Sequence, residues 1–240
     1  LTFMRFSSDQ IQRIGKEIRS KVDGKTLFDE FSRGRYSTDA SVYQIKPLGI
    51  VLPKDTNDVL NLMEYSQKNS IPLLARGGGS SQCGQTVGES VVLDYSKHQN
   101  KILDLNVEEK YVWVQPGVVL DHLNSFLRPY GLWFPVDVST SSRATIGGMS
   151  ANNSCGSRSL YYGNMVHNVL AIEAILDDGS LHTFDQINKN YLTTTNNQDR
   201  FFKIIDKFLN LRQKVSKDID ENWPTTQRRV GGYNIDLIDP

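Results

Sequence analysis

The chain has 240 residues, enough for one large domain or two small ones. Its 27 basic and 27 acidic side chains balance, which argues against nucleic acid or an acidic surface and favours a small-molecule or protein partner. No apolar run reaches the length of a membrane span, and the first residues lack a secretory signal. We therefore expect a soluble, cytoplasmic protein.

Two cysteines are too few for a disulfide framework or for a structural zinc or iron–sulfur site. The sequence lacks an initial methionine and stops within an apolar-polar alternation. We expect it to be the N-terminal fragment of a longer protein.

The first third of the chain shows helical periodicity, a polar stretch and then a strand–helix–strand pattern. This order predicts a βαβ unit. The elements are a surface helix at 7–22, a turn-rich stretch at 31–47, a buried strand at 48–53, a helix at 54–69 and a strand at 71–76.

The rest of the chain favours short strands that pair antiparallel, with helices between them. The predicted elements are strands at 90–96, 101–106 and 110–117 that form a second sheet, a helix at 118–131, a hairpin at 168–184 that turns at Asp178 and Gly179, and a helix at 196–215. The mixture predicts an α+β fold, with a small βαβ subdomain beside a mixed or antiparallel sheet flanked by helices. We divide it into a helical extension (1–42), a central domain (43–185) and a helical continuation (186–240).

The stretch LLARGGGSSQCGQ (73–85) places three consecutive glycines directly after a strand. Glycine permits positive φ angles and lets a ligand approach the main chain, while successive N–H groups form a concave anion site. The spacing fits neither the P-loop nor the G-x-G-x-x-G pattern. A phosphate-binding loop and a mobile surface turn both remain open from this stretch alone.

A second stretch, residues 134–164, contains almost no large aliphatic side chain but many hydroxyls and four glycines. Such a segment builds a poor core and could line one extended polar ligand. We expect a short helix from Ala144 to Asn152, in which Gly147 and Gly148 allow close approach of the ligand. A long flexible connector is the alternative.

In this order, the two stretches resemble the PCMH-type FAD-binding domain of the vanillyl-alcohol oxidase superfamily, over residues 43–184. Residues 50–85 resemble its entry strand, helix and pyrophosphate loop, and residues 91–170 resemble its second FAD-contact region. Residues 35–47 and 228–239 most resemble the D-2-hydroxyacid dehydrogenase branch, which includes glycolate oxidase-like, D-lactate dehydrogenase-like and D-2-hydroxyglutarate dehydrogenase-like proteins.

The resemblance implies an FAD-dependent oxidoreductase that transfers hydride from a D-2-hydroxy acid, such as D-lactate, glycolate or D-2-hydroxyglutarate, to FAD. Electrons would then pass to a quinone or to an iron–sulfur protein or domain, and any membrane association would come through that acceptor. The implied diphosphate ligands are Arg76, Gly77, Gly78, Gly79, Ser80, Ser81, Gly84 and Gln85. The other implied FAD contacts are Pro135, Asp137, Ser139, Thr145, Gly147, Gly148, Asn152, Asn153, Ser154, Gly156, Ser157, Tyr162 and Gly163.

Two departures from the family pattern limit these expectations. Family members that attach flavin covalently through this loop have histidine where Ser80 stands, so we expect noncovalent FAD. Cys83 is expected to be a small core or loop residue, and attachment of flavin through its thiol is the alternative. The chain also ends before the family's Glu-Gly-Thr-Leu-Gly strand and lacks the cap that holds its catalytic and metal-binding groups. We therefore assign no catalytic residue and no metal.

The remaining polar residues favour structural roles. The four histidines are far apart in sequence and are expected to be surface or packing residues. Arg35, Tyr36 and Asp39 could face a flavin, although loop hydrogen bonding is the favoured interpretation.

Two other functions stay open. One is a flavoenzyme resembling UDP-N-acetylenolpyruvoylglucosamine reductase, which uses NADPH, and the other is a nucleotide-binding module without a redox role. If the two stretches bind FAD, valine at Gly78 or Gly148 is expected to abolish FAD retention and leave most of the fold intact.

Overall fold

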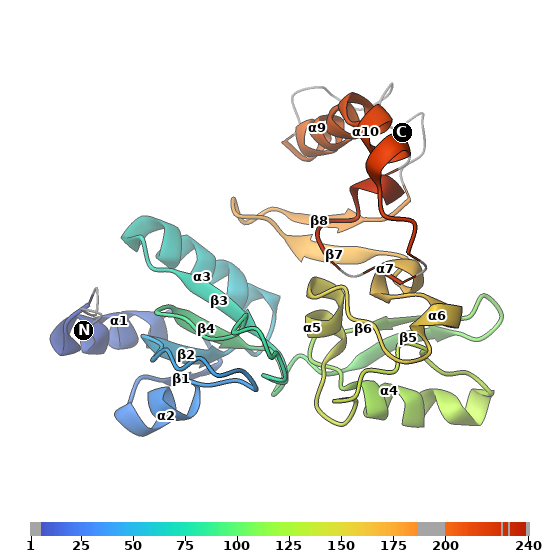
Figure 1. Cartoon of the computed structure of the whole chain (residues 1–240). Coiled ribbons are helices and arrows are strands. Elements are labelled where there is room, and N and C mark those ends of the chain that lie inside the picture. The colour runs from blue at the N-terminus through green and yellow to red at the C-terminus, as the bar shows by residue number, and fades with distance from the viewer. Residues whose placement is uncertain (1–5, 187–199, 227, 230, 239–240) are drawn as a thin grey trace.

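The structure is a computed structural model that describes residues 6–186, 200–226, 228–229 and 231–238. Figure 1 shows an N-terminal lobe built on one sheet, a second lobe built on a hairpin, and a further hairpin beneath two C-terminal helices. In the described part of the chain, no helix is both long and apolar enough to cross a bilayer.

The N-terminal lobe contains a four-stranded sheet in the order β1-β2-β4-β3. Its strands are β1 (Lys25–Leu27), β2 (Gly49–Leu52), β3 (Leu73–Arg76) and β4 (Val91–Asp94). Strands β2, β4 and β3 run parallel, whereas β1 pairs antiparallel with β2. The predicted strand–helix–strand unit is present as β2, α3 (Thr56–Asn69) and β3.

The sheet buries apolar side chains on both faces. One face packs against α1 (Ser8–Arg19) and α3 in a core that includes Ile18, Val51 and Leu62. The other face presents Ile50 and Val92, which pack with Tyr36, the residue that ends α2 (Glu30–Arg35). Burial of both faces explains why the central strands are continuous apolar runs in the sequence.

The expectation that residues 90–96 begin a second, antiparallel sheet is wrong. Strand β4 lies between β2 and β3 and pairs parallel with both. All four of its residues are buried, as expected for the centre of a parallel sheet. The strand follows β3 through the long glycine-rich loop, and the crossover places that loop at the carboxyl edge of the sheet.

Residues on both sides of the predicted boundary at 42/43 contribute to this lobe. Strand β1 pairs with β2, and Ile11 and Ile14 of α1 belong to the same core as Leu48. The division of the chain at residues 42 and 185 stays a prediction.

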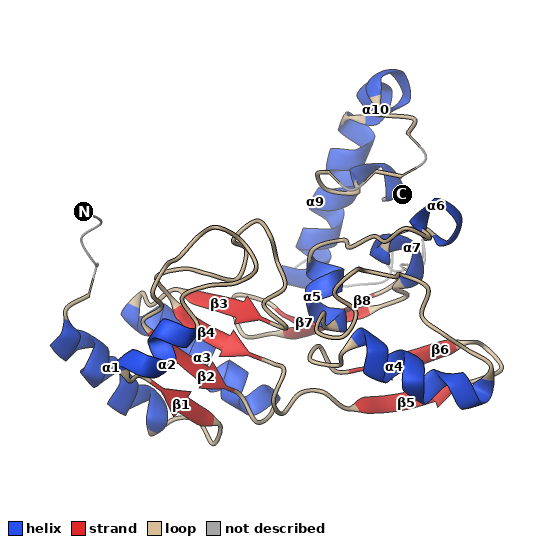
Figure 2. Ribbon diagram, turned by 60° about the horizontal axis from the view of Figure 1, so that its bottom comes forward, coloured by secondary structure: helices blue, strands red, loops and turns tan. Residues whose placement is uncertain are grey.

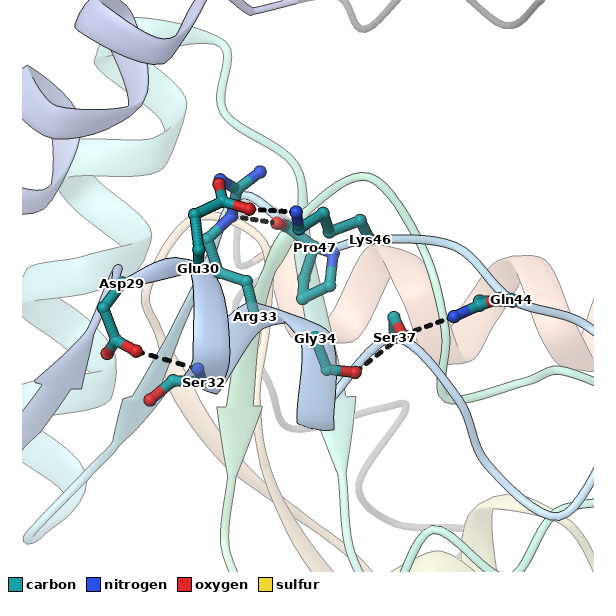
Figure 3. A network of polar contacts seen from close by, with 9 residues as sticks. All are labelled: Asp29, Glu30, Ser32, Arg33, Gly34, Ser37, Gln44, Lys46 and Pro47. Carbon is teal, nitrogen blue, oxygen red and sulfur yellow. Dashed lines mark hydrogen bonds and ion pairs between the residues drawn. The ribbon is translucent and has the colours of Figure 1, made fainter.

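Helix α2 anchors the chain where it enters β2 (Figure 3). Buried Arg33 donates from Nε to the carbonyl oxygen of Pro47 (2.8 Å) and pairs with Glu30 (2.6 Å), which also pairs with Lys46. Ser37 donates to the carbonyl oxygen of Gly34 (2.7 Å). These bonds fix both ends of residues 36–46, a segment that reaches the glycine-rich loop.

The second lobe contains an antiparallel hairpin and four short helices. Strands β5 (Ile102–Asn106) and β6 (Tyr111–Val114) form the predicted pair, followed by α4 (Leu120–Leu127) and the 3₁₀ turn η1 (Arg128–Tyr130). Helices α5 (Ile146–Ala151), α6 (Ser159–Tyr162) and α7 (Met165–Asn168) follow. Met149 of α5 and Met165 of α7 pack against Leu120 and Val136, so part of the hydroxyl-rich segment does enter a core.

The last part contains the predicted hairpin of β7 (Ile172–Ile175) and β8 (Leu181–Phe184), with Gly179 at φ +83° in its turn. Helix α9 (Arg200–Lys214) follows, then α10 (Ser216–Asn222) and the 3₁₀ turn η2 (Ile235–Leu237). The predicted helix at 196–215 corresponds to α9, and residues 196–199 lie outside the described residues. Phe201 attaches α9 to the hairpin by stacking on His182, with ring centres 4.4 Å apart.

Candidate functional site

The two segments singled out from the sequence meet in the structure. We call residues 76–85 the glycine loop and residues 134–164 the second segment. Figure 2 shows the loop that leaves β3 beside α5 of the second segment. The side-chain amide of Gln85 donates to Asn152 Oδ1 (2.8 Å), joining residues 67 positions apart. The glycine loop and the second segment are therefore in direct contact.

Two glycines of the loop are required by this contact itself. A Cβ on Gly77 would overlap the hydroxyl of Thr145, and a Cβ on Gly78 would overlap the carbonyl oxygen of Arg143. Neither atom belongs to a flexible side-chain end, because one is a helix cap and the other is main chain. Glycine at these positions thus permits the two segments to touch each other.

Five successive N–H groups of the glycine loop, at residues 77–81, donate no hydrogen bond to any described residue. The N–H of Cys83, farther along the loop, donates to the hydroxyl of Ser81 (3.2 Å). Gly79 has φ +63°, a left-handed conformation that curls successive N–H groups toward one side. The side chains of Ser81 and Gln85 bond to each other and close the end of the loop. The arrangement fits an anionic group that accepts several hydrogen bonds.

Arg76 links the glycine loop to the neighbouring main chain through hydrogen bonds. Its guanidinium donates to three carbonyl oxygens: those of Thr38 (2.8 Å), Thr86 (3.2 Å) and Tyr36 (3.5 Å). The same group lies over the Tyr36 ring, 5.2 Å from its centre. The geometry therefore gives Arg76 a scaffolding role, whereas the sequence suggested a cation for the diphosphate.

Residues 36–46 brace the glycine loop through polar contacts within the protein. The Tyr36 hydroxyl donates to Asp94 (2.6 Å); burial, together with this bond to a carboxylate, raises the pKa of Tyr36. Asp39 accepts from Thr86 (3.1 Å). Tyr43 packs where a Cβ on Gly84 would lie, and Gly84 has φ +73°. Tyr36 and Asp39 make ordinary loop hydrogen bonds, as the favoured interpretation expected.

The first N–H groups of helix α5 are hydrogen-bonded to other residues of the second lobe. Ile146 donates to the carbonyl oxygen of Val118 (2.8 Å) and Gly147 to that of Pro116 (2.9 Å), while Gly148 is capped by Thr145 (3.4 Å). A Cβ on Gly147 would collide with Pro116. A Cβ on Gly148 would approach only the Thr145 hydroxyl, at 3.2 Å. Gly148 is thus the residue of this pair whose bare surface stays open to a ligand.

Asp137 organises the middle of the second segment. It accepts from the hydroxyl of Ser157 (2.7 Å) and from the N–H of Arg158 (3.0 Å), and a Cβ on Gly156 would overlap it. Burial raises the pKa of Asp137, but these hydrogen bonds and the Arg158 charge outweigh burial, so its pKa lies below the ordinary value. Asp137 stays ionised and serves the fold of this segment.

Asn153 ends the turn after α5 in a left-handed conformation, with φ +46°. Its Oδ1 accepts from the N–H of Val166 (3.1 Å), and its Nδ2 donates to Asn234 (3.3 Å). Beside it lies an open cavity of about 250 Å³ with mainly apolar walls. The lining includes Ser150, Asn153, Met165, Ile172, Phe184 and Asn234.

Two of the remaining predicted residues, Tyr162 and Gly163, pack against residues outside the glycine loop. Tyr162 belongs to α6, which is on the side of α5 away from β3 (Figure 1), and its ring packs edge-on against Trp133, 5.1 Å between centres. Gly163, at φ +79°, packs against His167. Across the described ranges, the structure gives no hydrogen bond between the glycine loop and Pro135, Ser139, Ser154, Tyr162 or Gly163.

Three residues near the site were missed from the sequence. Arg143 is exposed, lies beside Gly78, and its guanidinium makes no hydrogen bond or ion pair with any described residue. Arg228 donates to the carbonyl oxygen of Gly156 (3.0 Å), and Asn234 contacts Asn153. The branch resemblance of residues 228–239 pointed to that segment, but no spacing in the sequence places it against Gly156.

No cluster of metal-ligating side chains is present in the part of the chain that the structure describes. His167 accepts from the N–H of Asn164 (3.0 Å), and His182 stacks on Phe201. These two histidines have local packing and hydrogen-bonding roles.

Comparison with known proteins places this geometry in a family. The family described as FAD binding domain matches residues 47–185. D-2-hydroxyglutarate dehydrogenase of Haemophilus influenzae is 43% identical over 212 residues, which cover 83% of this chain and 20% of that protein. The glycolate oxidase protein GlcD of Bacillus subtilis is 33% identical over 170 residues, covering 69% of this chain and 36% of the relative. The chain thus spans between a fifth and about a third of these relatives.

Solved structures agree with the fold. Physcomitrella patens BBE-like 1 superimposes with a TM-score of 0.62 at 19% identity, covering 71% of this chain and 37% of that protein. The 6-hydroxy-D-nicotine oxidase of Arthrobacter nicotinovorans gives 0.62 at 17% identity, covering 71% and 38%. The predicted α+β architecture of this type of FAD-binding domain is confirmed.

Proposed function

The chain belongs to the FAD binding domain family, and from that premise we propose that it is the FAD-binding part of an enzyme that oxidises a D-2-hydroxy acid. D-Lactate, glycolate and D-2-hydroxyglutarate are the proposed substrates, because the similar curated proteins carry the names of enzymes for such acids. The observation that carries the proposal is the contact of the glycine loop, whose N–H groups at 77–81 are free among the described residues, with the second segment on both sides of the exposed Gly148, at Thr145 and Asn152.

The free N–H groups at 77–81 fit the FAD diphosphate as neutral hydrogen-bond donors. Gly148 gives the main chain of α5 close access to the same group. The main-chain carbonyl of Arg143 lies beside Gly78, and its exposed guanidinium is proposed to reach the diphosphate from there, while Arg76 keeps the loop in shape. The other residues assigned from the family resemblance, from Ser80 to Gly163, remain proposed contacts along the cofactor.

The cavity beside Asn153 supplies a second kind of surface. Its walls are mainly apolar, with amides of Asn153 and Asn234 at the edge. Planar ring systems bind well to surfaces of this composition. We assign it to a ring of the same cofactor.

FAD held by these residues would supply the oxidant that takes up a hydride from the α-carbon of the hydroxy acid, as the hydroxyl loses its proton and the carbon–oxygen bond becomes a carbonyl. The chain's own part is to bind the cofactor, to fix its orientation and to present one face to the substrate. We assign no catalytic base to this chain. A quinone or an iron–sulfur protein or domain is proposed as the electron acceptor.

FAD is proposed to bind noncovalently, because Ser80 offers no imidazole for attachment. Acid precipitation of the FAD-loaded protein is expected to release the yellow colour into the supernatant. Colour that stays with the pellet would contradict noncovalent binding, and Cys83→Ser would then test a thiol attachment.

Anaerobic reduction of bound flavin tests the substrate class. The longest available form of the protein, loaded with FAD, is mixed separately with D-lactate, glycolate, D-2-hydroxyglutarate and NADPH. Loss of the visible flavin absorbance with a hydroxy acid and not with NADPH is expected. Bleaching by NADPH alone would favour the reductase, and absence of flavin binding would favour a module without a redox role.

A further inference from the structure

The end of the described chain folds back over the second segment. We call Arg228, Arg229 and residues 231–238 the C-terminal strap. Arg228 donates to the carbonyl oxygen of Gly156 (3.0 Å), and Asn164 donates from Nδ2 to that of Arg229 (2.7 Å). These contacts join residues more than sixty positions apart.

An internal ion pair holds the strap in shape. Arg229 lies 2.6 Å from Asp236, and their side chains are only 21% and 17% exposed. The Arg229 guanidinium also lies over the ring of Trp223, 4.6 Å from its centre. A partly buried charged pair with restricted side chains keeps Asn234, which lies between its members in sequence, in a defined place.

Asn234 contacts the one residue of the second segment whose backbone is left-handed without being glycine. Asn153, at φ +46°, occupies a conformation that is rare for side-chain-bearing residues and persists where its surroundings hold it. The side-chain Nδ2 of Asn153 donates a hydrogen bond to Asn234 (3.3 Å), and the N–H of Val166 donates to the Oδ1 of Asn153 (3.1 Å). The Asn153 side chain is therefore fixed at both ends.

This bond lies next to the contact between the two halves of the site. Asn152, the preceding residue, receives the hydrogen bond from Gln85 of the glycine loop. Asn153 and Asn234 also line the apolar cavity beside α5. A change in the Asn153 turn would displace both the Gln85 contact and the cavity wall.

We propose that Asn234 is a positioning residue of the cofactor site, which holds the Asn153 turn in its left-handed form from the C-terminal strap. The proposal rests on the proposed function for its effect on FAD, although its structural part concerns the protein alone. The proposal gives the C-terminal strap a role in retention of FAD. Asn234 exerts this role through Asn153, without contacting FAD itself.

Hydrogen exchange of the FAD-free protein tests the structural part. Asn234→Ala removes the acceptor and is expected to raise exchange of the Val166 amide about fivefold, the effect of one lost hydrogen bond. Asn234→Asp keeps an oxygen within reach of Asn153 Nδ2 and is expected to restore slow exchange. Asn210→Ala is the matched control, because it removes an exposed amide that contacts only Asp206 among the interactions seen.

FAD affinity, measured by quenching of flavin fluorescence, tests the functional part. Asn234→Ala is expected to weaken binding about fivefold, and Asn210→Ala to leave it unchanged. Arg228→Ala, which releases the strap from Gly156, is a second variant for the case that Asn234→Ala does not fold. Wild-type exchange at Val166 in both strap variants would overturn the proposal. Failure of the wild-type chain to bind FAD would reject the proposed function, while the exchange result would still decide the role of Asn234.

Discussion

The glycine loop and the second segment have similar compositions but use them differently. In the glycine loop the N–H groups at 77–81 are free of partners among the described residues, and Arg76 holds the loop through its hydrogen bonds to carbonyl oxygens. In the second segment Asp137 and the start of α5 bond within the protein. Small polar residues therefore hold the fold together in the second segment, whereas in the glycine loop we propose that the main chain donates to a ligand.

This difference separates a framework from a binding surface. Gly77 and Gly78 lie where the two regions touch, whereas exposed Gly148 has only the Thr145 hydroxyl beside its Cβ position, at 3.2 Å. A variant at Gly78 should therefore lower both stability and FAD affinity, whereas a variant at Gly148 should lower FAD affinity without a comparable loss of stability.

Removal of Arg76 is expected to have the largest effect. Arg76→Ala deletes a charged donor to three carbonyl oxygens, so the free energy of unfolding should fall by roughly 3 kcal/mol. Arg143→Ala should change it by less than about 0.5 kcal/mol and still weaken FAD binding. Urea unfolding without FAD measures the free energy of unfolding of both variants and distinguishes their effects. An Arg76→Ala protein of wild-type stability with reduced FAD affinity would make Arg76 a phosphate ligand instead.

The glycine pair should give the next largest effect. Gly78→Ala forces a Cβ onto the Arg143 carbonyl and should cost about 1–3 kcal/mol of stability as well as FAD binding. Gly148→Ala should change stability by less than about 1 kcal/mol, because the helix preference of alanine offsets its close contact with the Thr145 hydroxyl, and yet weaken FAD at least about tenfold. Thermal melting and FAD titration measure both quantities. Unchanged FAD affinity in Gly148→Ala would exclude close approach of the cofactor at α5.

The structure also revises the expectation that Gly78 and Gly148 act alike. Contact with the second segment explains Gly78, whereas space for the cofactor stays the proposed explanation for Gly148.

The hydrogen bond between Gln85 and Asn152 should contribute less. A double-mutant cycle with Gln85→Ala and Asn152→Ala is expected to give a coupling free energy of about 1 kcal/mol in urea unfolding. A coupling near zero would show that the segments are held together by packing at Gly77 and Gly78 without help from this bond.

The acid response of Asp137 should be the smallest effect. Its pKa is lowered in the folded protein, so its carboxylate stabilises the fold above the ordinary value of 3.8. That stability is lost as pH falls through the lowered pKa. Asp137→Asn should therefore be less stable than wild type at neutral pH, with the difference shrinking below pH 3.8, as followed by urea unfolding. A stability difference between wild type and Asp137→Asn that stays constant with pH would show that the charge of Asp137 does not cause it.

Much of the fold follows from local sequence signals. Apolar periodicity locates α1 and α3, and the Asp178 and Gly179 turn locates the last hairpin, because these signals reside within single elements. Strand β4 was assigned to the wrong sheet because its partners, β2 and β3, are chosen by long-range pairing that no local pattern encodes. Strand β1 and helix α2 were missed because both are short and polar at the surface.

The candidate site was predictable as two segments and less so as individual roles. Backbone freedom identified the glycine loop and α5, whose contact is now seen through Gln85 and Asn152. The scaffolding role of Arg76 depends on carbonyl groups of residues 36–38, which only the tertiary fold brings near. The same reason hid Arg228 and Asn234.

Hydrogen exchange with different ligands tests the central claim most directly. We predict that FAD slows exchange at residues 77–81 and at the start of α5 near Gly148 together, whereas riboflavin, which lacks the diphosphate, leaves 77–81 unprotected. Protection by FAD confined to one of the two regions, or equal protection of 77–81 by riboflavin, would contradict a shared diphosphate site.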